Sequence, residues 1–233
     1  MGIAFRSLTL TIGVLTVCSQ PAYSQVMGGV LINEVYSGGG SSQAIAAYHT
    51  DYIELFNNGT TPVDISGYVL AYGSSTQAAG SFPTAIGTIP AGTALPAGGF
   101  YLIRTGSSGT GGAADPNADV VFSSGASLSA TSGAIRLQNA SAITLDVIGW
   151  GTTNNFEGAP SASPTSIGVS LQRFPNGLDT NNNLTDFQSA TPTPSAANVA
   201  GVPEPGSLSL VACAAALGFA LRRHSSRRKN SVV

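Results

Sequence analysis

Short apolar stretches separated by turn sequences fill the chain between residues 25 and 201, and helical periodicity is nearly absent from that region. Asn58-Gly59, Asn176-Gly177 and the 96–99 stretch (PAGG) supply residues that tolerate positive φ or fix a proline φ, so the chain can reverse direction there. Many short strands joined by such turns predict an all-β fold, an immunoglobulin-like antiparallel β-sandwich. The predicted strands are 30–36, 52–56, 68–72, 100–104, 120–122, 135–138, 143–150 and 168–174.

The charge of the central region excludes one class of partner. Residues 26–201 contain ten acidic side chains, three arginines and no lysine, which gives this region a net charge of −7. Affinity for nucleic acid depends largely on lysines and arginines that neutralise phosphates. We therefore expect no binding of nucleic acid. The region has no cysteine either, because both cysteines of the chain, Cys18 and Cys213, lie in the terminal apolar segments.

The first 24 residues have the pattern of a secretory signal peptide. Arg6 precedes an apolar stretch from residue 8 to 17, and Ala22 and Ser24 place small residues before Gln25. The sequence predicts that signal peptidase cleaves between Ser24 and Gln25. The protein is then exported, and the mature chain begins at Gln25.

The C-terminal segment has three parts in a fixed order. A proline-rich linker contains Pro203, Glu204 and Pro205, an apolar run covers residues 206–221, and five basic residues follow between 222 and 229. As a helix the apolar run would be about 24 Å long, which is short of the roughly 30 Å hydrocarbon thickness of a membrane. The basic residues favour a cytoplasmic end, with the large domain on the other side of the membrane.

This three-part segment resembles a PEP-CTERM sorting signal over residues 202–229. The resemblance implies that an exosortase, a membrane transpeptidase, recognises Pro203, Glu204 and Pro205 and removes the helix and the basic tail. It also implies a location in the cell envelope, at the outer surface or in the extracellular matrix. The sequence leaves open whether the C-terminal helix is removed or retained as an inner-membrane anchor.

A second resemblance, to the lamin tail domain, is carried by an ordered series of short motifs. They are LINEV (31–35), DYIELFN (51–57), VDISGY (63–68), LPAGGFYLI (95–103) and the 143–150 stretch that ends at Trp150. The resemblance implies an immunoglobulin-like sandwich with a binding or scaffolding role and no reaction. The stretch 153–200, rich in proline, serine and asparagine, is similar to the extension that often follows this domain.

Several groups of residues could support catalysis or metal binding. Glu34, Asp51 and Glu54 could pair for acid–base chemistry, but carboxylates within strand motifs usually accept hydrogen bonds at edges or turns. His49 is interpreted as a solvated loop residue, and the glycine-rich stretch 109–114 lacks the helix that a dinucleotide site needs. The 179–186 loop (DTNNNLTD) places oxygens at alternate positions, as a Ca²⁺ site would, but it lacks the sharp-turn glycine and the closing glutamate. An asparagine-rich turn is the favoured interpretation of this loop.

Together these observations divide the chain into a signal peptide (1–24), a lamin-tail-like sandwich (25–152), a β extension and linker (153–201) and a sorting segment (202–229). The predicted function is a secreted binding or structural protein with no catalytic residues, no cofactor and no metal. Its expected partners are signal peptidase and exosortase during export, and extracellular polysaccharide or envelope proteins afterwards. The alternative is a hydrolytic or enzyme-accessory protein with a site in the acidic loops.

Overall fold

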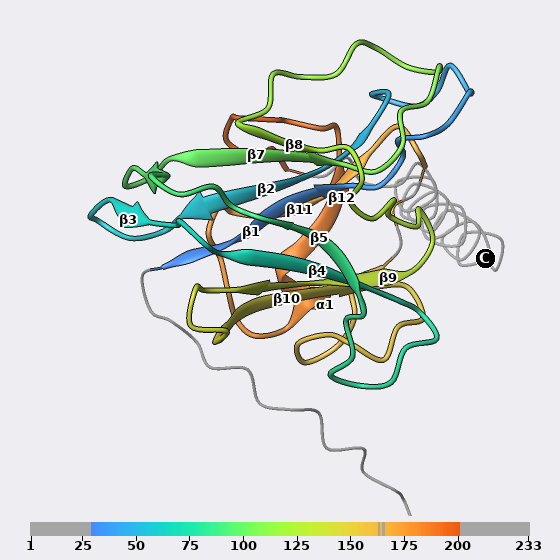
Figure 1. Ribbon diagram of the computed structural model, residues 1–233. Helices are drawn as coiled ribbons and strands as arrows, with labels where there is room; N and C mark the ends of the chain where they lie inside the picture. The colour runs from blue at the N-terminus through green and yellow to red at the C-terminus, as the bar shows by residue number, and fades with distance from the viewer. Residues whose placement is uncertain (1–28, 163, 165, 201–233) are drawn as a thin grey trace, which may run out of the picture.

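The computed structural model describes residues 29–162, 164 and 166–200, and the regular secondary structure of this part of the chain is almost entirely β-strand (Figure 1). One short helix, α1 (Asn183–Asp186), lies between the last two strands. The strands are β1 (Val30–Tyr36), β2 (Asp51–Asn57), β3 (Val63–Asp64), β4 (Val69–Ser74), β5 (Thr84–Thr88), β6 (Ala94–Leu95), β7 (Phe100–Thr105), β8 (Val120–Phe122), β9 (Gly133–Gln138), β10 (Thr144–Trp150), β11 (Ser170–Arg173) and β12 (Phe187–Ala190).

The strands form two main sheets that lie in separate layers (Figure 1). One sheet has six strands in the order β12-β11-β1-β2-β7-β8, and the other has four in the order β10-β9-β4-β5. Strands β3 and β6 pair as a small separate ladder. Strands β7 and β8 run parallel, whereas the other described strand pairs are antiparallel. This architecture confirms the predicted immunoglobulin-like sandwich.

The apolar core fills the space between the two sheets. Alternate residues of a strand face opposite sides of its sheet, so Ile53 and Leu55 of β2 enter this core while Tyr52 belongs to a separate aromatic cluster. Trp150 of β10 is fully buried, and its indole N–H donates to the Ser129 carbonyl at 3.0 Å. The polar atom of this large side chain is thereby satisfied inside the core.

Strand β1 lies inside the six-stranded sheet, between β2 and β11, and carries an irregularity. Its pairing with β2 shifts between Ile32 and Glu34, which makes Asn33 the extra residue of a bulge. At this point the Ile32 N–H donates to the Asp146 carboxylate at 2.7 Å, and the Ile32 carbonyl accepts from the Arg173 guanidinium at 2.8 Å. The bulge therefore opens the backbone of a central strand to two buried charged side chains.

The stretch after residue 152 completes the six-stranded sheet. Strand β11 pairs with the open side of β1, and β12 pairs with β11. Strands β3, β5, β6 and β12 and helix α1 were not among the sequence predictions. Strands β3 and β6 contain only two residues each. In β5 only Ile86 is buried, and β12 (FQSA) is a short, largely polar stretch, so neither has a strong apolar pattern. Helix α1 is a single turn, capped by the Asn182 side chain, which accepts from the Leu184 N–H.

Candidate functional site

Two glutamates face each other in the middle of the six-stranded sheet. Glu34 on β1 is the register partner of Glu54 on β2, and both side chains are fully buried. The interpretation of these acids as hydrogen-bond acceptors is confirmed, but their expected position at an edge or turn is wrong. They lie on interior strands because the later strand β11 covers β1 and β7 covers β2.

Residues 191–199, which follow β12 and are called here the crossing segment, supply half of the hydrogen bonds to this glutamate pair. The Thr193 N–H and hydroxyl donate to Glu34 at 3.1 and 3.0 Å, and the Ser195 N–H donates to Glu54 at 2.5 Å. Ser195 has φ of 62°, in the left-handed region that non-glycine residues rarely adopt. Hydrogen bonds to the two glutamates thus hold the backbone of the crossing segment in place. They also help to maintain the strained left-handed conformation of Ser195.

The far end of the crossing segment is anchored to β1 and β11. The Asn198 side-chain amide donates to the carbonyls of Asn33 and Arg173 at 3.0 and 2.8 Å. The Val199 N–H donates to the Gln172 side chain at 3.2 Å. The chain is therefore fixed to the sheet as far as residue 199.

Burial and proximity change the acidity of this site. Burial and, to a smaller extent, the neighbouring Glu34 together raise the pKa of the Glu54 carboxyl to about 8, against the lowering effect of the Ser195 and Asn33 hydrogen bonds. The Tyr52 hydroxyl donates a short hydrogen bond to Glu34. Burial also raises the pKa of Tyr52 well above its usual range, with Glu34 adding to the shift. The tyrosine therefore remains a neutral hydrogen-bond donor at physiological pH.

Asp51, the third acid considered for catalysis, lies at the start of β2 and joins two loops. Its carboxylate accepts from the Gly39 N–H at 2.8 Å and from the Leu128 N–H at 2.7 Å. Burial raises the pKa of Asp51 to about 7, and the two backbone hydrogen bonds oppose this shift. Its oxygens thus bind the loop after β1 to the loop before β9.

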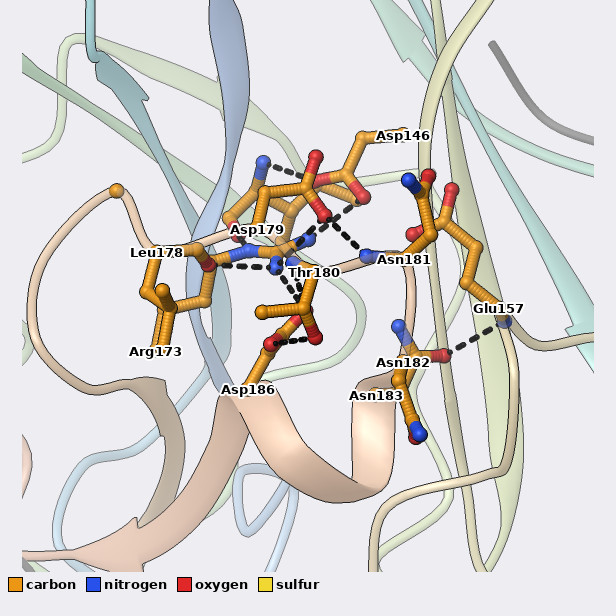
Figure 2. A network of polar contacts seen from close by, with 12 residues as sticks. Asp146, Glu157, Arg173, Leu178, Asp179, Thr180, Asn181, Asn182, Asn183 and Asp186 are labelled. Atoms are coloured by element: carbon orange, nitrogen blue, oxygen red, sulfur yellow. Dashed lines mark hydrogen bonds and ion pairs between the residues drawn. The ribbon is translucent and has the colours of Figure 1, made fainter. Parts of the chain in front are cut away.

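A third buried acidic group surrounds Arg173 of β11, which has no exposed side-chain surface (Figure 2). The guanidinium donates to Asp146 of β10 at 2.7 Å, to Asp186 of α1 at 3.0 Å and to Asp179 at 3.4 Å. It also donates to the carbonyls of Ile32 and Leu178, and it lies 4.5 Å from the centre of the Phe187 ring. Every nitrogen of the guanidinium therefore has a partner, and the cluster joins both sheets to the 179–186 loop.

Charge neutralisation explains why this arginine can be buried. Burial alone would lower the pKa of Arg173, but the neighbouring carboxylates of Asp146, Asp179 and Asp186 raise it above its ordinary value. Burial raises the pKa of Asp146, whereas Arg173 and the Ile32 N–H lower it. Two hydrogen bonds of 2.7 Å to Asp146 favour its ionised form. The cluster is a paired, hydrogen-bonded network, as burial of charge requires.

The 179–186 loop uses its oxygens within the protein. Asp186 accepts from the Thr180 N–H and hydroxyl at 2.9 and 2.7 Å in addition to Arg173. The buried Asn183 side chain accepts from the N–H groups of Gly149 and Glu157 and donates to the Val147 carbonyl. These contacts agree with the interpretation of the loop as an asparagine-rich turn. Among the described residues no group of three or more histidine, cysteine or acidic side chains could hold a metal ion.

Glu157 is a buried acid that the sequence did not point to. Burial and the nearby carboxylates of Asp146 and Asp179 together raise its pKa to about 9, against the lowering effect of Arg173. Its Oε2 atom has no hydrogen-bond partner among the residues that the structure describes. At neutral pH the protonated form of Glu157 is therefore favoured beside the Arg173 cluster.

Of the remaining residues that the sequence analysis singled out, some lie in described loops and the others lie in the two terminal segments. His49 lies in the loop between β1 and β2, and its carbonyl accepts from Gly40 and Gly109. The stretch 109–114 is a loop packed on residues 41–47, and the next element after it is strand β8 rather than a helix. Both terminal signals fall outside the described residues, and this applies to Ala22, Ser24, Gln25, Pro203, Glu204, Pro205 and the C-terminal apolar run. Within residues 29–162, 164 and 166–200, no helix is long and apolar enough to cross a membrane.

The fold and its strand order define an immunoglobulin-like domain completed by a C-terminal β extension. A sequence profile of the Lamin Tail Domain family matches residues 24–152. The match covers more than half of the chain, and the chain therefore belongs to the lamin tail domain family. Among proteins with curated descriptions, none matches it significantly. The lamin-tail resemblance is thus confirmed, and the sorting signal stays a prediction.

Proposed function

We propose that this chain is an exported lamin-tail-domain protein with a binding or structural role at the cell surface. The observation that carries the non-catalytic part of this proposal is the use of the buried acids. Glu34, Asp51 and Glu54 all accept hydrogen bonds from backbone N–H groups and are almost completely buried. A general acid or base must come within hydrogen-bond reach of its substrate. These carboxylates instead stabilise loops and the crossing segment.

The C-terminal part of the proposal rests on the order of the proline-rich tripeptide, the apolar run and the basic residues. In this proposal an exosortase recognises Pro203, Glu204 and Pro205 and cleaves the chain. Val199 is the last residue with a described anchor to the sheet. Four further residues reach at most about 14 Å even when fully extended. A membrane enzyme that acts at Pro203 would therefore work with the folded domain held close to the membrane surface.

The same proposal names the partners. Signal peptidase would remove residues 1–24, and exosortase would process residues 202–229. Once exported, the domain would meet extracellular polysaccharide or envelope proteins. Its net charge of −7 between residues 26 and 201 supports the exclusion of nucleic acid.

Replacement of Pro203, Glu204 and Pro205 by alanine tests this proposal in the native host. We expect the variant to stay unprocessed in the inner membrane, whereas the wild type reaches the surface without its basic tail. A matched control replaces Ser225 and Ser226 by alanine, within the same segment but outside the tripeptide, and should be processed normally. Mass spectrometry of the surface fraction measures the C-terminus. Recovery of wild-type surface protein that retains residues 222–229 would overturn the processing proposal.

A further inference from the structure

A cavity of about 290 Å³ lies at one end of the six-stranded sheet, far from the terminal segments in sequence. The end of β7, the edge strand β8, Thr50 before β2 and the loop that follows β7 form its walls. In Figure 1 this loop rises beyond the ends of β7 and β8 at the top of the molecule. The volume can hold one small ring molecule, since it is close to the lower limit of about 300 Å³ for ligand pockets.

Most of the residues that line this cavity have polar side chains, and together these side chains carry no net charge. Arg104 donates to Asp115 at 2.8 Å, and these are the two ionic side chains of the lining. Asp115 also accepts from the Thr50 N–H at 2.8 Å, which fixes its carboxylate. The other polar side chains of the lining are hydroxyls, from Thr50, Thr105, Ser107, Ser108 and Ser123. Such walls offer both donors and acceptors without attracting either an anion or a cation strongly.

Two polar atoms in the lining side chains have unused hydrogen-bonding capacity. Thr50 Oγ1 and Arg104 Nε have no partner in the described part of the chain. An unpaired polar atom away from water is costly, and a native structure needs a reason to keep one. A ligand hydroxyl can donate to one group and accept from another at the same time. Both atoms are buried, so the hydroxyl groups of a ligand would reach them only after the two side chains shift.

An apolar surface completes the cavity. Val121 of the edge strand β8 lines it and remains 49 % exposed, so its methyl groups are accessible from the cavity. A ring that carries several hydroxyls also has C–H groups on its faces, and these can pack against Val121. Phosphate and sulfate have no such apolar face, and Asp115 beside Arg104 would repel them.

We propose that this cavity binds a single neutral pyranose ring, with Arg104 and Asp115 bonding its hydroxyls and Val121 contacting its C–H face. The inference deepens the proposed binding role by naming a ligand class and a site, and it rests on that role alone rather than on C-terminal processing. A ligand of this size usually binds with a dissociation constant of about 1 mM or weaker.

Saturation-transfer NMR on the purified, unprocessed full-length chain provides the test. The protein is kept in dodecylphosphocholine, which has no sugar headgroup. The probes are the methyl pyranosides of glucose, galactose, mannose and N-acetylglucosamine, with methyl phosphate as an anionic probe. We expect saturation transfer to at least one methyl pyranoside and none to methyl phosphate. Since processing plays no part in this experiment, its outcome is independent of the exosortase test.

Three variants distinguish specific binding from background. Ser107→Leu adds bulk at an exposed lining position that donates a hydrogen bond through its backbone N–H rather than its side chain, so it should fold normally and reduce transfer at least about fivefold. Arg104→Met should have the same effect. Arg136→Met is the matched control, because Nε of Arg136 is also buried and has no hydrogen-bond partner among the described residues, but Arg136 does not line the cavity. Saturation transfer should not change in this variant. The proposal is overturned by no transfer from any pyranoside, by transfer that survives in Ser107→Leu, or by transfer to methyl phosphate that Arg104→Met abolishes.

Discussion

Arg173 offers the sharpest test of how the two sheets are held together. Replacement of Arg173 by methionine keeps much of the side-chain volume but leaves Asp146 and Asp186, both fully buried, without their cationic partner. Breaking a buried ion pair by removing one partner costs about 3–5 kcal/mol, because an uncompensated charge stays buried. The five hydrogen bonds of the guanidinium, to Ile32, Leu178, Asp146, Asp179 and Asp186, disappear with it. We therefore expect the free energy of unfolding to fall by about 4 kcal/mol.

Urea denaturation followed by tryptophan fluorescence measures this change, since Trp150 is fully buried and is the only tryptophan. With a slope of about 2 kcal/mol per molar urea, the midpoint should shift down by about 2 M. Arg136→Met is the control, because Arg136 has no ion pair in the described residues and contacts the Phe82 ring at 4.8 Å. Its loss should cost about 1 kcal/mol or less. If the two variants unfold at the same urea concentration, the argument from buried charge is refuted.

Two further predictions follow from the buried acids and from the C-terminal strands. The pKa of Glu54 is raised from 4.5 to about 8 in the folded protein, so its stabilising contribution is complete below about pH 4.5 and is lost as the pH rises to 8. Glu54→Gln should therefore be as stable as the wild type at pH 5 and more stable than the wild type at pH 9, by about 1 kcal/mol or more, as measured by thermal melts. If the difference in stability between variant and wild type is the same at both pH values, this prediction is wrong. A chain that ends at residue 152 lacks β11, β12 and Arg173, and it should show no cooperative melting by near-ultraviolet circular dichroism, whereas residues 29–200 should melt sharply. Cooperative melting of the shorter chain would refute the role assigned to the extension.

The sequence predicted the strands whose burial is continuous or alternates clearly. The 30–36 prediction matches β1 at both ends, and the motif at 51–57 forms β2. Local pattern was enough there because the apolar residues of these strands are the ones that enter the core. Strands β5 and β12 were missed because most of their residues are small or polar, and pairing with neighbouring strands decides their conformation.

The charged site was much harder to predict than the strands. Glu34, Asp51 and Glu54 were recognised as candidates. Several of the residues that bury them lie more than a hundred positions away in the sequence, as Thr193 does for Glu34. Nothing in the sequence marked Arg173 as a buried residue, since a charged residue at the end of a short strand normally faces water. Arg173 finds its buried partners only in the folded protein, where the bulge in β1 and Asp146 of β10 lie beside it. Such long-range contacts leave no periodic trace in the sequence.

The position of β1 has a consequence for the order in which the fold can assemble. This strand lies near the start of the domain, yet one of its two neighbours, β11, comes more than 130 residues later, and the crossing segment that covers Glu34 comes later still. Contacts of such large sequence separation slow folding, because a long loop must close before they are formed. In a chain that emerges from its N-terminus, β1 therefore keeps an unpaired edge until the last strands arrive. Free strand edges promote pairing between chains, so the sheet is exposed to association with other copies for most of its assembly.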